Sequence, residues 1–194
     1  MARPRSEDKR SAILDAATRV IAAEGLSAPT AKIAKLARVA AGTLFTYFTN
    51  KDVLLNELYL QLKAELRQVM SPEDFGAVKN ARSAKAAAQR AWTRYVSWGV
   101  AHPEKRKVLA QLGVSDRITA ENKAAGMVGF TSLNAFLAQA TASTILPQQS
   151  GAFIGALLGA MAETTMDFIA RDPARAQEYG QAGFEAFWNA LGVE

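Results

Sequence analysis

The stretch Pro29–Lys51, PTAKIAKLARVAAGTLFTYFTNK, decides the fold of this chain. It predicts two short helices joined by a tight turn, followed by the first residue of a third helix. Ile33 and Ala34 fall on the apolar face of the first helix, and Leu44 and Phe48 continue that face on the second. The pattern is typical of a helix-turn-helix, although an αα-hairpin inside an all-helical core would show the same periodicity.

The outward face of the second helix carries only short or hydrogen-bonding side chains. Ala40, Ala41, Thr43 and Tyr47 lie on this face. A DNA major groove is wide enough to admit one α-helix and presents hydrogen-bonding groups and thymine methyls at its floor. The second helix is therefore a candidate recognition helix.

The run ARVAAGTLFTYFTNKDVLL, residues 37–55, resembles the DNA-binding signature of the TetR family of bacterial one-component regulators. The matching residues are Gly42, Thr43, Leu44, Phe45, Tyr47, Phe48, Asn50 and Lys51. The resemblance covers roughly residues 7–55, and beyond them only the length, helix content and layout are similar.

Two residues depart from the family pattern. Arg38 replaces a turn glycine, so a residue with a side chain must accept that backbone geometry. Ala40 replaces a capping Ser or Thr, which removes about 1 kcal/mol of capping.

The resemblance implies a set of DNA contacts. Ala41 and Thr43 would face bases, Ala40 and Ala41 would meet thymine methyls, and Thr30, Tyr47 and Lys51 would bind phosphates. Separately from the resemblance, residues 1–5, MARPR, form a short basic arm ahead of a helix cap at Ser6. Arg3 and Arg5 would enter a minor groove or touch a phosphate, or else belong to a solvated tail.

Composition indicates a helical, soluble protein. The chain has 194 residues, 49% of them hydrophobic and 21% charged, and it contains no Cys. Abundant Ala, few Pro and the lack of β-branched runs predict an all-α fold of about nine helices. Three helices would form a DNA-binding head, residues 1–51, and six would form a ligand-binding and dimerisation bundle, residues 52–194.

The positive charge is concentrated at one end of the chain. The net charge is +5, and residues 1–51 carry all of this excess, while residues 52–194 are neutral overall. Contacts to DNA phosphates require such a basic segment, although a solvated basic face would look the same.

Start and stop signals place the remaining helices. Gly25 ends the first helix and Asn50 caps a long helix from Lys51 to about Ser71, which would link head and bundle. Pro103 opens a short helix after the break at His102. The other helices are expected at residues 81–101, 116–143, 147–170 and 174–191.

Catalytic and metal chemistry find little support. His102 is the only histidine, so a zinc site and a Ser-His-Asp relay both lack partners. We therefore expect no enzyme activity, no cofactor and no metal.

The N-terminus shows no signal peptide, and the apolar stretch before Glu163 is about twelve residues, short of the ~18 that span a membrane. These features predict a cytoplasmic protein without a membrane partner.

Aromatic and flexible apolar residues in the bundle predict a pocket for a hydrophobic or aromatic effector. Each of these residues would serve equally well as ordinary core. The candidate lining residues are Trp92, Tyr95, Trp98, Gln111, Met127, Phe130, Thr131, Asn134, Met161 and Thr165.

Gly151, Gly155 and Gly159 line one helix face at a spacing that lets another backbone approach. A neighbouring helix of the same chain could fill that space. The resemblance favours instead a homodimer interface, built from this helix and the last one, with Phe184, Phe187 and Trp188.

Two functions remain open at this point. The resemblance implies a ligand-responsive transcriptional repressor that binds a palindromic operator as a homodimer and releases it when a small molecule binds. The alternative is a helical small-molecule-binding or catalytic protein in which the helix-turn-helix is only scaffold.

Overall fold

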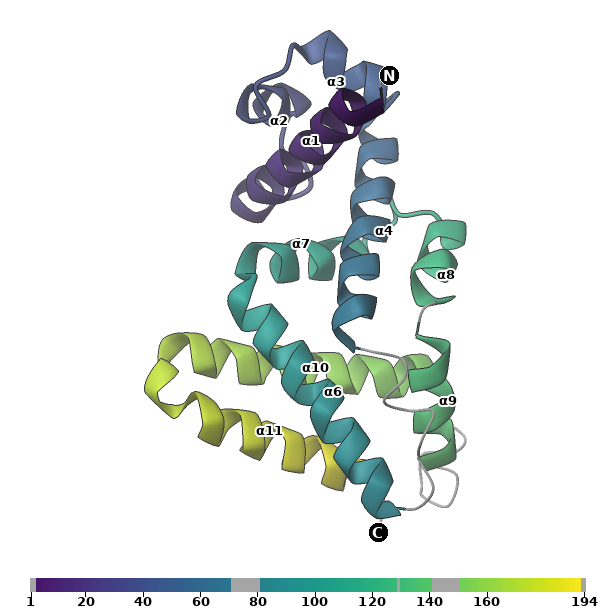
Figure 1. Ribbon diagram of the computed structural model, residues 1–194, viewed down its shortest axis with the longest axis vertical. Coiled ribbons are helices and arrows are strands. Elements are labelled where there is room, and N and C mark those ends of the chain that lie inside the picture. Colours follow the sequence, from purple (N-terminus) through teal and green to yellow (C-terminus); the bar gives the residue numbers. More distant parts are fainter. Residues whose placement is uncertain (1–2, 71–80, 129, 141–150, 193–194) are drawn as a thin grey trace. The chain divides into compact units, whose positions relative to one another are not determined.

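The computed structural model describes residues 3–70, 81–128, 130–140 and 151–192, and these residues form helices without any strand (Figure 1). The helices are α1 (Arg3–Glu24), α2 (Thr30–Leu36), α3 (Ala41–Tyr47), α4 (Lys51–Met70), α6 (Ala81–Ala101), α7 (Pro103–Val114), α8 (Ala120–Val128), α9 (Thr131–Ala140), α10 (Gly151–Arg171), the 3₁₀ helix η1 (Pro173–Arg175) and α11 (Ala176–Ala190). The all-α prediction is confirmed.

By its contacts the chain divides into two compact units. The first unit comprises Met1–Ala64 and His102–Met127, and the second comprises Glu65–Ala101 and Val128–Glu194. The predicted domains, residues 1–51 and 52–194, stay a prediction about function. Packing divides the chain differently, because α7 lies directly against α1. A segment from the middle of the chain thus belongs to the same unit as the helix-turn-helix.

The first unit is built around one apolar core. Its fully buried side chains come from five helices, the last of them distant in sequence: Ile13, Leu14 and Ile21 of α1, Ile33 of α2, Leu44 of α3, Leu54, Leu55, Leu58 and Leu62 of α4, and Val108 and Leu112 of α7. Burying each such side chain stabilises the fold by about 1.5–3 kcal/mol. This core gives the helix-turn-helix a rigid base.

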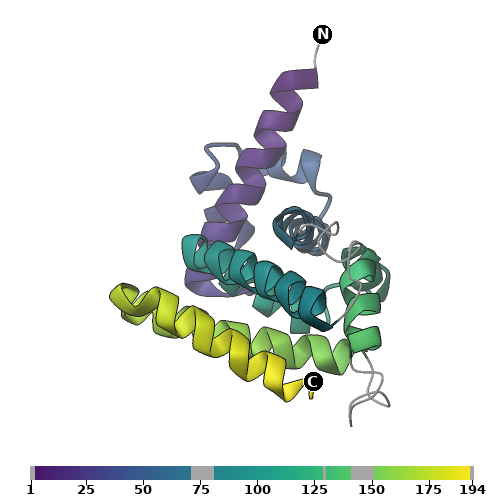
Figure 2. The ribbon, with the colours of Figure 1, turned by 60° about the horizontal axis from the view of Figure 1, so that its bottom comes forward.

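The second unit packs α6 against α10 and α11, which lie side by side in both ribbon views (Figures 1 and 2). Its aromatic centre is Trp92 of α6, which stacks on Phe187 at 5.7 Å between ring centroids and meets Phe184 at 6.4 Å. Both phenylalanines belong to α11. These contacts hold α11 against α6 through large, well-packed rings.

Several predicted boundaries are confirmed. The amide of Val53 donates to Asn50 Oδ1 at 2.9 Å, which is the expected cap at the start of α4. Gly25 ends α1 with a left-handed φ of 83°. Pro103 opens α7. The predicted helix start at Pro147 lies outside the described residues.

Two boundary predictions are wrong. Helix α1 begins at Arg3, so residues 3–5 belong to a helix and not to an extended arm. Pro4 does not prevent this, because the first helical turn needs no intrahelical amide donors. The single helix expected at residues 116–143 is two helices, α8 and α9, which belong to different units. Gly126 lies in α8 where a Cβ would come within 2.7 Å of Tyr59 Cε1, so the glycine permits a close approach to α4.

Candidate nucleic-acid interface and ligand groove

In the turn between α2 and α3, the backbone of Arg38 adopts a left-handed conformation. Its φ is 56°, and the neighbouring amide of Val39 donates to the Ala34 carbonyl at 3.0 Å. The side chain of Arg38 is exposed. A non-glycine residue in this region costs roughly 1–2 kcal/mol, so the turn keeps a costly geometry that fixes how α3 leaves α2.

Helix α3 is anchored on one face and open on the other. Leu44 and Phe48 are fully buried in the core of the first unit, while Ala40 and Ala41 are exposed and Thr43 is half-buried. Ala40 occupies the N-cap position with extended φ and ψ angles, and its methyl group cannot accept a capping hydrogen bond. Ala40 and Ala41 thus lie on the free side of the helix, and Thr43 lies partly covered.

Phe45 was not among the predicted contact residues, but it adds an apolar group to α3. Its side chain is 45% exposed, as is that of Leu36 near the end of α2. Both residues lie outside the period of the buried stripe, and that offset is the sequence signal that identifies them. Phe45 lies one helical turn after Ala41, so it enlarges the apolar surface on that side of α3.

Thr30 and Tyr47 lie at opposite ends of the helix-turn-helix. Thr30 is the first residue of α2 and is half-buried, and Tyr47 is the last residue of α3 and packs partly against the core of the first unit. Arg3 and Arg5 lie in the first turn of α1, and their side chains are outside the described part of the structure.

Lys51 begins α4, where the helix dipole and free amides favour an anion. Its ammonium group is turned inward and donates to the Ala28 carbonyl. Burial, together with the nearby positive charge of Arg117, lowers the pKa of Lys51 below its ordinary value. A phosphate at this position would have to replace the carbonyl as the acceptor.

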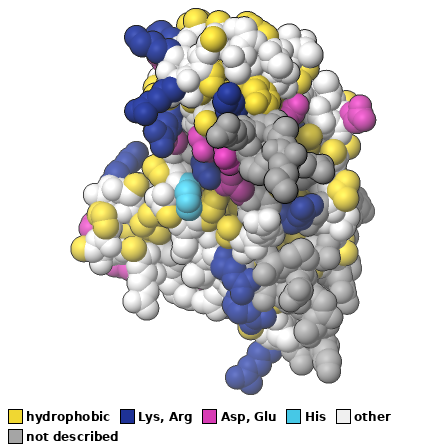
Figure 3. Space-filling model, turned by 45° about the horizontal axis from the view of Figure 1, so that its top comes forward, with side chains coloured by type: hydrophobic (Ala, Val, Ile, Leu, Met, Phe, Trp, Pro, Cys, Tyr) yellow, Lys and Arg dark blue, Asp and Glu magenta, His cyan; other side chains and the backbone are white. Residues whose placement is uncertain are grey.

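Basic side chains are numerous on the surface of the helix-turn-helix and α1. Figure 3 shows Lys and Arg side chains gathered along one edge of the molecule. Lys9, Arg19, Lys35 and Arg38 are exposed, whereas Lys32 is paired with Glu24 at 2.8 Å. The positive surface predicted from the charge distribution is therefore available to solvent over several helices.

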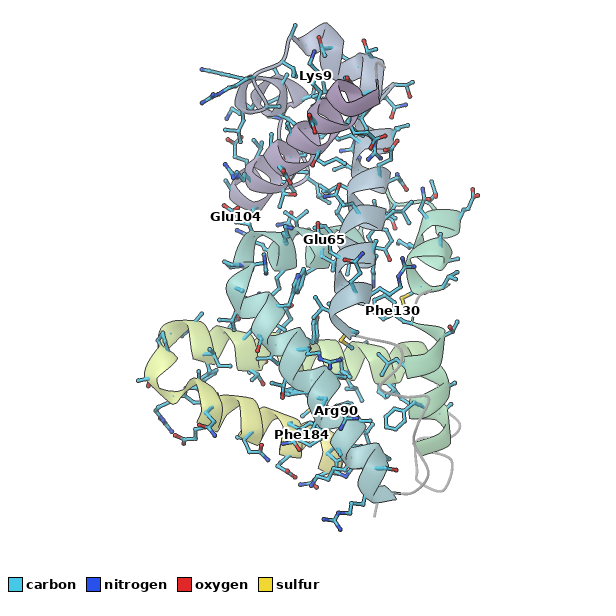
Figure 4. All side chains as sticks on the ribbon, in the orientation of Figure 1. Lys9, Glu65, Arg90, Glu104, Phe130 and Phe184 are labelled. Carbon is cyan, nitrogen blue, oxygen red and sulfur yellow. The ribbon has the colours of Figure 1, made fainter. Side chains whose placement is uncertain are left out.

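In the second unit, a half-open groove of about 560 Å³ lies between α6 and α11. Trp92 and Phe184 contribute aromatic surface, and Figure 4 shows Phe184 of α11 at the side facing α6. The indole Nε1 of Trp92 donates to the Gly180 carbonyl at 3.0 Å. The other lining residues are Gln89, Thr93, Val96, Ser97, Val100, Ala101, Ile169, Ala176, Gln177 and Gln181.

The polar groups of this groove are amides and hydroxyls. Gln89 Nε2 donates to Gln181 Oε1 at 2.9 Å, so these two side chains connect α6 with α11. Gln89, Thr93 and Ser97 recur every four residues on α6, beside Trp92. That polar stripe next to an aromatic residue was the available sequence signal. The groove suits an uncharged or weakly polar ligand with an aromatic or aliphatic body.

Within the described part of the chain, the predicted effector residues do not line one common hollow. Trp92 lines the groove, and Trp92 and Tyr95 also line a second hollow of only about 10 Å³, too small for a ligand. Trp98 is buried and lines neither of these two hollows. Gln111 and Met127 belong to the first unit, and the rest of the set belongs to the second.

The remaining predicted effector residues lie on α9 and α10. Phe130 is buried, just ahead of α9, and Thr131 is exposed. Met161 is half-buried on α10, and its carbonyl accepts from the buried Thr165 hydroxyl at 2.8 Å. The side chain of Asn134 lies outside the described part of the structure.

The predicted dimer residues fall into two groups. Among the described residues, nothing lies within 4 Å of a Cβ placed at Gly155 or Gly159, so no helix of the same chain fills the space beside them. Gly151 begins α10, and its surroundings are not described. By contrast, Phe184, Phe187 and Trp188 are 5% exposed or less, and they pack inside their own chain. They support α11 from within and do not form its outer surface.

Helix α10 has an exposed apolar side. Phe153, Leu157 and Phe168 are 37–46% exposed. The segment Phe153–Arg171, with a mean hydropathy of 1.3, is long and apolar enough to cross a membrane by length and composition alone. Glu163 and Asp167 interrupt it. A single helix of this kind is weak evidence for a membrane span, because the core helix of a soluble protein passes the same test.

Within the described residues, no group of three or more His, Asp or Glu side chains is placed to hold a metal ion. His102 lies at the N-cap position of α7 and is exposed.

Comparison with known proteins connects these features to one family. Residues 13–58 match the model of the bacterial regulatory proteins of the tetR family. A stretch of 64 residues is 41% identical to the uncharacterized HTH-type transcriptional regulator YhgD of Bacillus subtilis, covering 32% of this chain and 34% of that protein. The chain thus spans about a third of the length of this curated relative.

Solved structures are similar over nearly the whole chain. A crystal structure from Shewanella sp. PV-4 is 25% identical with a TM-score of 0.78, covering 94% of this chain and 97% of that one. A TetR family transcription regulator from Marinobacter aquaeolei VT8 is 22% identical with a TM-score of 0.81, covering 97% of each chain. FadR from Bacillus subtilis, solved in complex with stearoyl-CoA, is 20% identical with a TM-score of 0.67, covering 91% of this chain and 96% of that one.

Proposed function

Because the chain belongs to the tetR family of bacterial regulatory proteins and is a DNA-binding transcriptional regulator, we propose that it represses transcription as a ligand-responsive homodimer. The homodimer binds a palindromic operator in the cytoplasm, and a small effector releases it. The observation that carries this proposal is α3, which is anchored by Leu44 and Phe48 and leaves Ala40, Ala41 and Thr43 free for the major groove.

On the operator, Ala41 and Thr43 read bases, and Ala40 and Ala41 contact thymine methyls. Phe45 extends this apolar contact, since nearly half of its side chain is exposed. Thr30, Tyr47 and Lys51 bind phosphates, which position the helix but carry no sequence information. Arg3 and Arg5 add charge at the start of α1.

The dimer interface is formed by the open side of α10 and the outer face of α11. Gly155 and Gly159 have free space beside their backbones, and Phe153, Leu157 and Phe168 expose apolar surface on another side of the same helix. Covering this surface with a second copy of the chain removes it from water, which stabilises the assembly. Two-fold symmetry would place the recognition helices about 34–36 Å apart, one DNA turn.

The effector binds in the groove between α6 and α11. Its volume of about 560 Å³ lies within the usual range for small-molecule sites, and Trp92 and Phe184 supply apolar surface. The complex of FadR with stearoyl-CoA supports small-molecule binding by a protein of this fold. We expect a hydrophobic or aromatic effector with few hydrogen-bonding groups, because the lining carries no Lys, Arg, Asp or Glu.

Selection of genomic fragments by the purified protein, followed by a gel shift with the DNA flanking its own coding region, tests operator binding. We expect one enriched palindrome bound by two chains. Ala41→Asp should abolish binding, because it places a carboxylate on the free face of α3, and Ala23→Asp on exposed α1 surface is the matched control.

Native mass spectrometry of the same preparation tests the effector. A retained small molecule that is lost from a Ser97→Trp variant would support the groove. A protein that retains a small molecule but enriches no DNA would favour the alternative, in which the helix-turn-helix is only scaffold.

A further inference from the structure

A buried asparagine in α4 connects that helix to the segment between α7 and α8 within the first unit. Asn56 is 7% exposed, and its amide Nδ2 donates to the Asp52 and Arg117 carbonyls, each at 2.8 Å. Its Oδ1 accepts from the Thr119 amide at 3.0 Å and from Asn122 Nδ2 at 2.8 Å. The side chain therefore makes the four hydrogen bonds that an asparagine amide can form.

Arg117, in the same segment, reaches two parts of the helix-turn-helix region. Its Nε donates to Asp52 Oδ1 at 2.6 Å, and its Nη1 donates to the Leu26 carbonyl at 3.4 Å. Leu26 lies in the turn that leads from α1 to α2, and Asp52 lies in the first turn of α4. One guanidinium group thus bridges the entry to the helix-turn-helix and the start of the helix that follows it.

The same two places are joined a second time by Lys51 and Ala28. The Lys51 ammonium donates to the Ala28 carbonyl, two residues after Leu26, and Lys51 directly precedes Asp52. The positive charge of Arg117 acts on the Lys51 ammonium. Arg117 and Lys51 thus both donate to carbonyls of the turn before α2, and both lie at the start of α4.

We propose that Asn56 and Arg117 form a joint that positions the start of α4 and the turn before α2 for operator binding. Asn56 fixes the register of α4 against residues 117–122, and Arg117 fixes residue 26 relative to residue 52. Neither side chain needs to touch DNA. The inference rests on the proposed operator binding. It assigns a positioning role in that binding to a segment more than sixty residues away from the helix-turn-helix in sequence.

Residues 102–127 are held in the first unit by the apolar core, and the joint sits on top of that attachment. Val108, Leu112 and Ile118 are buried in the same apolar core as α1 and α4, which brings residue 117 to the surface of α4. Apolar packing provides the attachment, and the hydrogen bonds of Asn56 set its register. Removing the side-chain amide of Asn56 would leave the Arg117 carbonyl and the Thr119 backbone amide without that partner. The two segments would then lose the hydrogen bonds that align them.

The test uses Arg117→Gln, which keeps a polar side chain but loses the charge and the fork geometry. Arg19→Gln is the matched control, because Arg19 is an exposed arginine of α1 in the same unit and its loss removes the same charge. Affinity for the operator and for unrelated duplex DNA is measured at a temperature where circular dichroism shows every variant to be folded.

We expect Arg117→Gln to weaken operator binding by about 5- to 100-fold while affinity for unrelated DNA falls much less. Arg19→Gln should reduce both affinities by the same small factor, because phosphate attraction is independent of sequence. Asn56→Ala should act like Arg117→Gln, and the double variant should lose less than the product of the two single effects, because both residues serve one joint. Equal loss on both DNAs, as in the control, would overturn the proposal.

Amide hydrogen exchange on the free protein gives a second readout that needs no DNA. Arg117→Gln should accelerate exchange at residues 26–30 and 51–56 at least about tenfold more than elsewhere in the unit. Uniform or unchanged exchange would refute the joint. If the wild-type protein enriches no DNA at all, the proposed function fails, and the exchange result still decides whether the joint exists.

Discussion

The Nζ atom of Lys51 lies 2.5 Å from the carbonyl oxygen of Ala28, so the cation at the start of α4 binds the protein's own backbone when DNA is absent. The contact keeps the side chain near the dipole of α4, where a phosphate can replace the carbonyl. The contact also ties the start of α4 to the turn before α2.

Replacing Lys51 with alanine should weaken binding to all DNA sequences about equally and reduce the salt slope by roughly one, because one phosphate contact is lost. Thr43→Ala should instead change the preference among operators. The measurement is fluorescence anisotropy over a series of salt concentrations. Lys107→Ala, at an exposed site on α7, is the control and should leave the slope unchanged. An unchanged slope in Lys51→Ala would exclude a phosphate contact.

Two substitutions in the helix-turn-helix should stabilise the protein. Arg38→Gly relieves a left-handed φ of 56°, and we expect a gain of about 1 kcal/mol in the free energy of unfolding. Ala40→Ser restores a side-chain cap to α3 and should add about 1 kcal/mol.

Chemical denaturation measures both gains. The controls are Lys35→Gly inside α2, which should cost about 1 kcal/mol, and Ala41→Ser, one residue after the cap position, which should give no gain. Destabilisation by Arg38→Gly would show that the arginine side chain contributes more than the turn strain costs.

Gly155→Leu should convert the proposed homodimer to monomer without unfolding the chain. A side chain at Gly155 meets no described atom of its own protomer within 4 Å, so the substitution acts on a partner and not on the core. Gly183→Ala is the contrasting variant, because its Cβ would lie 2.2 Å from Thr165 Oγ1 and 2.9 Å from Trp92 Cζ2. That variant should lower the melting temperature. Sedimentation that shows an unchanged dimer in Gly155→Leu would refute this interface.

The groove beside Trp92 should report ligand binding through its own fluorescence. In a Trp98→Phe, Trp188→Phe background, an apolar fluorescent probe such as anilinonaphthalene sulfonate should change Trp92 emission, because Trp92 lines the groove. Ser97→Trp fills the groove and should weaken probe binding about tenfold while operator affinity is kept. Arg82→Trp, exposed on the same helix, is the control. Probe binding that leaves Trp92 emission unchanged would place the site elsewhere.

The helix-turn-helix was predictable from the sequence because its signals are local. The apolar positions at three- and four-residue spacings bury Ile33, Ala34, Leu44 and Phe48. Asn50 caps α4 through a hydrogen bond only three residues away. Periodicity and capping depend on neighbours along the chain, so they can be recognised without knowledge of the fold.

Most of the residues predicted to bind the effector do not line the described groove, because an aromatic residue on an apolar face does not reveal what covers it. Tyr95 and Trp98 have the same spacing and chemistry as groove residues, yet neither lines the open groove. The groove arises where α11 leaves part of α6 uncovered, and Gln89 and Gln181, ninety-two residues apart, meet across it. Contacts at such separations have no local signal.

The sequence by itself determined the all-α fold, the helix-turn-helix and the basic N-terminal segment, since propensity, periodicity and charge are properties of short stretches. Only the tertiary structure decided that Phe184, Phe187 and Trp188 pack inside the chain while Gly155 and Gly159 face outward. Only the tertiary structure also placed Arg117 beside Asp52. The physical reason is the same in each case. Burial and pairing depend on which surfaces the apolar core brings together, and many arrangements of the same amphipathic helices satisfy the local pattern equally well.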